Sequence, residues 1–168
     1  MLKPAILFRE ELTRLYQSIW FNEKYKYYNY SSTWGTVLVE DKTNDWHEFV
    51  SINDKGEIIG YIHYYVVRST LNCRSLGIVN FSDDPAFGRD VLQVIRDIFE
   101  RFNFHKLDFS VVIGNPAEKS YDHLCKKYGG HILCIEKDET KLDDNQYYDV
   151  KRYCIMRNDY FAAKERRK

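Results

Sequence analysis

The sequence predicts a single α/β domain of the α+β type, in which helices flank a mixed, mostly antiparallel sheet. Its length of 168 residues suits one domain with its own core. From His47 onward, several apolar runs alternate with the period of two that is typical of strands. An amphipathic helix separates two of these runs and predicts a βαβ unit. No repeat or linker divides the chain, so we expect one domain over residues 1–168, with a basic tail from about residue 160.

Charge and cysteine content limit the classes of partner and the cellular compartment that we expect for this chain. The chain has 25 basic and 25 acidic residues, so no overall field attracts nucleic acid or an anionic membrane. Residues 1–10 do not resemble a signal peptide, and no run of about 18 apolar residues could span a membrane. The cysteines show no C-x-x-C spacing, which favours reduced thiols and a cytoplasmic location. They are Cys73, Cys125, Cys134 and Cys154.

The first expected element is an amphipathic helix with an apolar stripe at helical spacing. The stripe is Leu12, Leu15, Tyr16, Ile19 and Trp20. The irregular, aromatic segment "NEKYKYYNYSSTW" follows over residues 22–34. Next come "HEFVSI", the turn "NDKGE" and "IIGYIHYYVVR", which predict an antiparallel hairpin. A third extended run, "SLGIVNF", covers residues 75–81.

The second half of the chain begins with the clearest helix. Its apolar face is predicted from Val91, Leu92, Ile95, Ile98, Phe99 and Phe102. The strand "KLDFSVVIG" follows and should run parallel to residues 75–81, because a helix connects the two. Another helix is expected over residues 116–128, capped by Asn115 and stopped by Gly129. The closing strands are "HILCIE" and "YYDVKRYCIMR", joined by the acidic stretch "KDETKLDDNQ".

The turn "FSDDPAFG" between residues 81 and 88 is a candidate anion site. The N–H groups at a helix start, together with its dipole, can hold a phosphate. The donors expected here belong to Phe87, Gly88, Arg89, Asp90 and Val91. Asp83 and Asp84 would repel a phosphate unless they turn toward water, and Arg89 could offset that repulsion. The alternative is an ordinary connection in which one aspartate caps the helix.

The order of elements and two local motifs resemble the GCN5-related N-acetyltransferase family over nearly the whole chain. "FSDDPAFGRDVL" stands where this family has Gln/Arg-x-x-Gly-x-Gly/Ala before a helix. "NPAEKSYDHLCKKYGG" stands where it has asparagine, a short helix and Tyr-x-Lys-x-Gly. The resemblance implies acetyl-coenzyme A as co-substrate, no metal, and transfer of the acetyl group to a primary amine.

The motifs match only in part. Gly88 matches the last glycine or alanine of the turn, whereas Ala86 replaces a glycine and Asp83 replaces a basic or amide residue. In the second motif, Asn115 matches, and the general-acid position falls on Cys125, with Tyr121 one helical turn earlier. Pantetheine pairing with the third strand, as the resemblance implies, would involve Val79, Asn80 and Phe81.

The catalytic groups have structural alternatives. His63 could be the general base, because a neutral imidazole suits pH 7, or it could be a strand histidine within the sheet. Cys125 lies on an apolar stripe, so core packing is its alternative, and the Tyr121 hydroxyl is the better proton donor. The remaining histidines have no metal-ligand spacing.

The aromatic segment after the first helix is the candidate acceptor site. Tyr27, Tyr28, Tyr30 and Trp34 could frame an amine by cation–π contact. The same rings could form a stacking platform for nucleic acid, although the neutral charge argues against such a partner. They could also only fill space beside the sheet.

The sequence therefore predicts an acetyl-coenzyme-A-dependent N-acetyltransferase that acts on an amine of a small molecule or peptide. Two alternatives remain open: a degenerate member of the fold that binds without turnover, and an interaction module that uses residues 25–34. The acceptor and the oligomeric state are left open, and a homodimer is compatible with the sequence.

Overall fold

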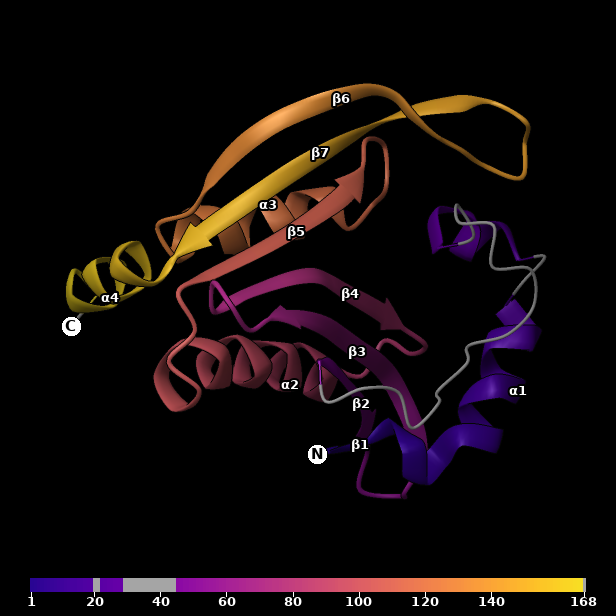
Figure 1. Cartoon of the computed structure of the whole chain (residues 1–168). Coiled ribbons are helices and arrows are strands. Elements are labelled where there is room, and N and C mark those ends of the chain that lie inside the picture. Colours follow the sequence, from indigo (N-terminus) through magenta and orange to yellow (C-terminus); the bar gives the residue numbers. More distant parts are fainter. Residues whose placement is uncertain (20–21, 29–44, 168) are drawn as a thin grey trace.

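Seven strands form one sheet in the order β1-β2-β3-β4-β5-β7-β6 (Figure 1). The computed structural model describes residues 1–19, 22–28 and 45–167. All neighbouring strands are antiparallel except β4 and β5, which are parallel. The expected α/β fold with a mixed, mostly antiparallel sheet is thus confirmed. The strands are β1 (Leu2–Pro4), β2 (Trp46–Ile52), β3 (Ile58–Val67), β4 (Asn72–Asn80), β5 (Lys106–Val112), β6 (His131–Lys141) and β7 (Tyr147–Met156).

Helices cover both faces of this sheet. Those of the first half are η1 (Ala5–Phe8), α1 (Arg9–Ile19), η2 (Glu23–Tyr28), α2 (Pro85–Arg96) and the π-helical turn η3 (Asp97–Arg101), which continues α2. Those of the second half are α3 (Glu118–Lys127) and α4 (Arg157–Glu165). None of the described helices is long and apolar enough to cross a membrane.

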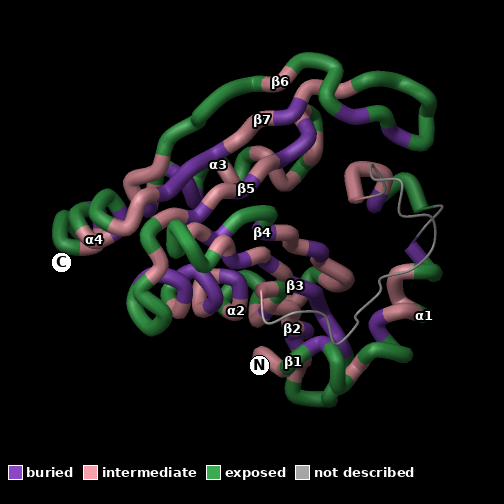
Figure 2. The backbone as a smooth tube through the Cα atoms, viewed as in Figure 1, coloured by how far each residue is buried: buried purple, intermediate pink, exposed green. Residues whose placement is uncertain are grey.

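Two apolar clusters form because strand side chains alternate between the faces. On β3, Ile62 and Tyr64 point into the larger cluster, which also contains the buried faces of α2 and α3. Tyr61 points to the other face, where it joins Leu12 of α1 and Tyr25 of η2 in a smaller cluster. The predicted helical stripes are therefore the surfaces that pack on the sheet. Figure 2 shows the buried central strands and the largely exposed edge strand β6.

Three elements differ from the sequence expectation. The short strand β1 was not expected, and it pairs with β2. Strand β6 runs on to Lys141, through the first half of the acidic stretch, where Thr140 and Lys141 pair with Tyr148 and Tyr147 of β7. Glu136 and Glu139 form ion pairs with Arg152 on β7. The stretch expected to be a basic tail from about residue 160 is helical as far as Glu165. Helix α4 extends to Glu165, and Tyr160 on it is buried.

The βαβ unit matches the expectation closely. Strand β4 leads through the turn at residues 81–84 into α2, and β5 returns parallel to β4. The following helix begins at Glu118, two residues later than expected. Asn115 first makes a tight turn, in which its Oδ1 atom accepts the Ala117 N–H at 2.9 Å. Gly129 ends the helix region at a φ of 74°, a conformation that favours glycine.

Candidate functional site

Strands β4 and β5 pair at one end only and then diverge. Their parallel pairing is Asn72 with Lys106 and Cys73 with Leu107 (Figure 1). Two residues farther along β4, Ser75 has a φ of 55°, and the register with β3 shifts between His63 and Tyr65. Such a bulge bends a strand and increases its twist. The bulge therefore accounts for a gap between two neighbouring strands in the middle of the sheet.

The edge of β4 that faces this gap carries backbone positions that do not pair with β5. The Phe81 N–H donates to the Ile59 carbonyl of β3 at 3.0 Å. Because residues of an antiparallel strand alternate in direction, Val79 and Gly77 also bond toward β3, whereas Ile78 and Asn80 face the gap. Of the three residues expected to pair with pantetheine, only Asn80 presents its backbone to the gap. Val79 and Phe81 do not, and the sequence analysis missed Ile78.

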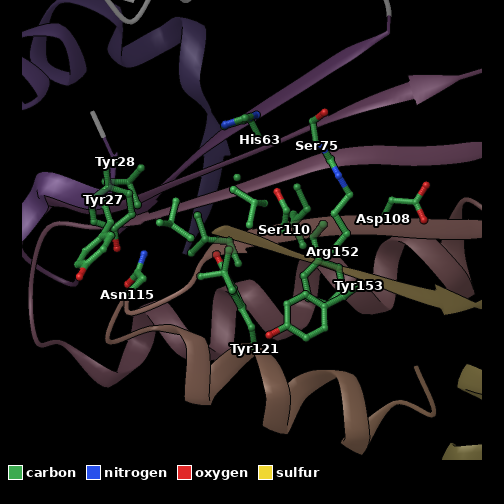
Figure 3. Close-up of a pocket in the computed structure, with 18 of the residues that line it drawn as sticks. Tyr27, Tyr28, His63, Ser75, Asp108, Ser110, Asn115, Tyr121, Arg152 and Tyr153 are labelled. Carbon is green, nitrogen blue, oxygen red and sulfur yellow. The ribbon is translucent and has the colours of Figure 1, made fainter. Parts of the chain in front are cut away.

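A cavity of about 980 Å³ occupies the gap (Figure 3). Its walls come from β4 and β5, from β2 and β3 on one side, and from α3, β6 and β7 on the other. Figure 3 shows His63 and Tyr121 approaching it from opposite sides. The cavity therefore brings together two of the three expected catalytic residues.

His63 lies in the cavity wall as a neutral imidazole. Burial lowers its pKa to about 4. Its Nδ1 atom is buried and has no hydrogen-bond partner among the described residues. The Nε2 side of the ring lies over Gly77 of β4, where an added Cβ would come within 2.0 Å of Nε2. Glycine at this position thus leaves the space that the imidazole occupies next to the gap.

The two candidate acids differ in their surroundings. Tyr121 of α3 lines the cavity, and its ring packs edge-on against Phe109 at 5.7 Å between centroids. Cys125 is buried in the larger apolar cluster and does not line the cavity. Burial raises the pKa of its thiol. The structure therefore favours the packing interpretation for Cys125 and leaves Tyr121 as the group that can reach a ligand.

The turn before α2 satisfies much of its own hydrogen bonding. The Asp84 carboxylate accepts the Ala86 N–H at 2.8 Å, and the Asp84 carbonyl accepts the Phe87 N–H at 3.1 Å. The Ser82 N–H donates to the Asn80 side chain at 3.2 Å, and the Asp84 N–H to the Ser82 hydroxyl at 3.2 Å. Asp84 is thus the helix cap, the alternative that the sequence left open. None of these turn residues lines the cavity.

The five residues expected to donate to a phosphate have different roles. Phe87 and Val91 are buried core side chains. Asp90 accepts the Ser51 hydroxyl at 2.7 Å and pairs with the N-terminal ammonium at 2.9 Å. Arg89 is exposed, and an added Cβ on Gly88 would meet no atom within 4 Å. Only Gly88 and Arg89 present an open surface at this helix start.

The segment η2 lies beside the last residue of β4 and the turn that follows β5. The Asn80 backbone forms a hydrogen bond with the Tyr28 hydroxyl, and an added Cβ on Gly114 would lie 3.3 Å from the Tyr27 hydroxyl. The Tyr27 and Tyr148 rings meet edge-on at 6.1 Å between centroids. Tyr27 and Tyr28 both line the cavity, as does Asn115. The expected acceptor residues Tyr30 and Trp34 lie outside the described residues.

The cavity wall contains charged and aromatic residues that the sequence analysis did not single out. Trp46 and Glu48 alternate along β2 and share the face on which Tyr61 and His63 lie. The period-two pattern of "WHEFV" could have placed them there once the hairpin register was known. Across the gap, Asp108 pairs with Lys106 at 2.8 Å. No group of three or more His, Cys, Asp or Glu residues in the described part of the chain could hold a metal ion.

Comparison with known proteins identifies structural neighbours at low sequence identity. No protein-family model matches the chain, and no curated protein is significantly similar to it. A crystal structure of a provisionally assigned acetyltransferase has a TM-score of 0.70 and 17% identity, covering 98% of this chain and 87% of its own. Spermidine/spermine N-acetyltransferase SpeG from Vibrio cholerae, in complex with manganese ions, has a TM-score of 0.60 and 19% identity, covering 91% and 77%.

A chimera of the same Vibrio cholerae spermidine N-acetyltransferase gives a similar result. Its TM-score is 0.63 at 17% identity, and the match covers 96% of this chain and 99% of the chimera. At such identities the likeness concerns the fold. The strand order, the diverging β4 and β5 and these matches show that the chain has the fold of the GCN5-related N-acetyltransferases.

Proposed function

We propose that the chain is an N-acetyltransferase that moves an acetyl group from acetyl-coenzyme A to the primary amine of a small molecule or peptide. The gap between β4 and β5 is the observation that carries this proposal. It offers a cavity that an extended thioester arm could enter, and Ile78 of β4 lines it with backbone groups directed toward the gap. Neighbours with this fold are acetyltransferases by description, which supports the reaction class.

In the proposed reaction, the lone pair of the amine forms a bond to the thioester carbonyl carbon. The Ile78 N–H stabilises the oxyanion that results. His63 accepts the proton of the attacking nitrogen at Nδ1 and later releases it to solvent. The carbon–sulfur bond then breaks, and the Tyr121 hydroxyl donates its proton to the departing thiolate. Solvent then returns a proton to the Tyr121 phenolate.

The proposed binding residues belong to the gap and to the start of α2. The donor arm would contact the β4 backbone at Ile78 and Asn80 and the side chain of Asn115, while its outer part would pass Gly88 and Arg89. The acceptor would lie on the side of Tyr27 and Tyr28. Spermidine is the acceptor named for the Vibrio cholerae neighbours, so it belongs among the amines to be tested. The four free thiols support a reducing compartment such as the cytoplasm.

A second candidate function is ligand binding without turnover. The observation that favours it is the Asp84 carboxylate on the Ala86 N–H, because a diphosphate would otherwise take such a donor. A second carboxylate, that of Asp83, is almost fully exposed beside it, 3.9 Å from Lys24. The helix start is therefore both capped and negatively charged.

Titration calorimetry with acetyl-coenzyme A and with S-acetyl-pantetheine separates the two candidates. A thiol-release assay over an amine panel then measures turnover. For an N-acetyltransferase we expect binding of at least one donor and amine-dependent thiol release. Release should fall at least tenfold in Tyr121→Phe, because the general acid is lost. Binding without release from any amine would favour the second candidate, and no binding of either donor would refute the N-acetyltransferase.

Asp84→Asn tests the closed turn directly. Asparagine caps helices as well as aspartate does, so the stability should be retained while the charge is removed. We expect coenzyme A to bind about three- to tenfold more tightly, corresponding to roughly 1 kcal/mol of relieved repulsion, and S-acetyl-pantetheine to bind unchanged. The matched control is Asp83→Asn, for which water screening predicts little change. An unchanged coenzyme A affinity in Asp84→Asn would show that the diphosphate does not approach this turn.

A further inference from the structure

Glu48 is a carboxylate in the cavity wall without a cationic partner. Its Oε1 atom accepts the Tyr61 hydroxyl at 2.5 Å, and no lysine or arginine of the described chain forms an ion pair with it. The other acidic groups of the cavity differ in this respect. Asp108 pairs with Lys106 at 2.8 Å, and Glu139 with Arg152 at 3.5 Å. Glu48 therefore carries a negative charge in this wall that no cation of the described residues balances.

Aromatic side chains share the face of the sheet on which this carboxylate lies. The Trp46 ring lies 5.7 Å from that of His63 and 5.3 Å from that of Tyr65, measured between centroids. On the next strand, Tyr61 packs against His63 at 5.3 Å. Aromatic faces attract cations, and this attraction strengthens where water is partly excluded. A carboxylate beside tryptophan and tyrosine is thus chemically suited to an ammonium group and unsuited to an anion.

The position of Glu48 in the sheet sets its distance from the reaction. His63 pairs in register with Gly77 of β4 on one side and with Glu48 of β2 on the other. Neighbouring strands lie about 4.8 Å apart, so Glu48 is roughly 5 Å from His63 and 10 Å from β4 across the sheet. An amine that reacts between His63 and the β4 edge would therefore need a chain of roughly 5–10 Å beyond the reacting nitrogen to reach Glu48.

We propose that the acceptor is a linear diamine or polyamine, whose second ammonium group is bound by Glu48 and Trp46 while its first nitrogen reacts beside His63. This inference rests on the proposed function and adds to it the substrate class and the residues that select it. The acceptor then carries a second positive charge roughly 5–10 Å from the reacting nitrogen. A monoamine of the same length could place its nitrogen beside His63 but would leave Glu48 unpaired.

Calorimetric titration of the full chain without any donor tests this binding directly. The probes are putrescine and n-butylamine, which share a carbon chain and differ in the second ammonium group. We expect the wild type to bind putrescine at least tenfold more tightly than n-butylamine. In Glu48→Gln this preference should disappear through weaker putrescine binding, while n-butylamine binding stays unchanged. The amide can still accept the Tyr61 hydroxyl, so the fold should be retained, as a melting curve would check.

Glu10→Gln is the matched control, because it also replaces a carboxylate by an amide, at an exposed position on α1 outside the cavity. It should bind both amines like the wild type. Equal wild-type affinities for the two amines, or a putrescine preference that survives in Glu48→Gln, would overturn the inference. Acetyl transfer to n-butylamine in such a case would leave the proposed function standing. Conversely, Glu48-dependent diamine binding without thiol release would support the ammonium site at Glu48 and refute turnover.

Discussion

At the scale of single residues, His63 combines the properties of a base with a cost to stability. The ring is buried, and its Nδ1 atom has no hydrogen-bond partner among the described residues, so protonation inside the fold is unfavourable. The imidazole therefore stays neutral at pH 7, as an acceptor of an amine proton must. A histidine that only packs in the core would be buried and neutral as well. Placement beside Gly77 and the gap is what distinguishes His63 from such a residue.

The buried imidazole predicts a loss of stability in mild acid. Its folded pKa of about 4 lies below the ordinary value of 6.5, so the unfolded chain binds a proton between these values and the folded chain does not. Stability should thus fall as the pH drops through this window. His63 accounts for about 2 kcal/mol of the loss between about pH 7 and pH 4.5.

Urea unfolding of the wild type and His63→Gln over this pH range measures the effect. Glutamine does not titrate, so the free energy of unfolding of the variant should fall less steeply with acid than that of the wild type. Parallel curves for the two proteins would show that His63 is not buried as described.

At the scale of elements, the site depends on strand β4, whose two edges have different neighbours. One edge bonds to β3, and beyond Cys73 the other faces the gap. The sequence analysis predicted the hairpin, the βαβ unit and the strand's place in the fold, because each depends on local periodicity and turn residues. It could not predict the bulge at Ser75, because serine rarely adopts a positive φ and no local pattern marks one.

The direction of each β4 amide also depends on register, which a single strand does not reveal. Of the three expected pantetheine contacts, Asn80 therefore directs its backbone toward the gap, whereas Val79 and Phe81 direct theirs toward β3. The helix cap is a similar case. Both Asp83 and Asp84 fit the cap from sequence, and only the three-dimensional turn shows which of them takes the Ala86 N–H.

Hydrogen exchange at β4 tests the assignment of its edges. The Ile78 amide faces the gap, whereas the Phe81 amide is bonded to Ile59 at 3.0 Å. We expect the Ile78 amide to exchange faster than the Phe81 amide in the free protein, and to slow when a donor binds. The Phe81 amide serves as the internal control and should not change. Calorimetrically detected donor binding without protection of Ile78 would place the donor elsewhere.

At the scale of the whole molecule, the diverging strands divide the sheet into two parts that other contacts must hold together. Strands β1 to β4 lie on one side of the gap, and β5, β7 and β6 on the other (Figure 1). Tyr160 of α4 connects the two parts. Its ring stacks on Phe99 at 4.7 Å and on Tyr128 at 5.2 Å between centroids, and its hydroxyl donates to Glu100 at 2.5 Å.

The helical C-terminal segment escaped the sequence analysis for a physical reason. Its basic composition is typical of a solvated end, and its helix has only a few apolar positions. What fixes it is tertiary packing, since Tyr160 fits between η3 and the end of α3, which are distant in sequence. Lys164 adds an ion pair with Glu100 at 2.8 Å, and together Lys164 and the Tyr160 hydroxyl lower the pKa of the Glu100 carboxyl.

This packing predicts that Tyr160 stabilises the whole molecule. Tyr160→Ala removes a large buried ring, so we expect the free energy of unfolding to fall by about 3–5 kcal/mol. Tyr160→Phe keeps the ring and loses only the hydroxyl bond, for which about 1 kcal/mol is expected. Arg166→Ala changes an exposed residue beyond α4 and should stay within about 0.5 kcal/mol of the wild type. Urea unfolding of the three variants provides the comparison. Since a solvated tail would make Tyr160→Ala as neutral as Arg166→Ala, equal stabilities would contradict the connecting role of α4.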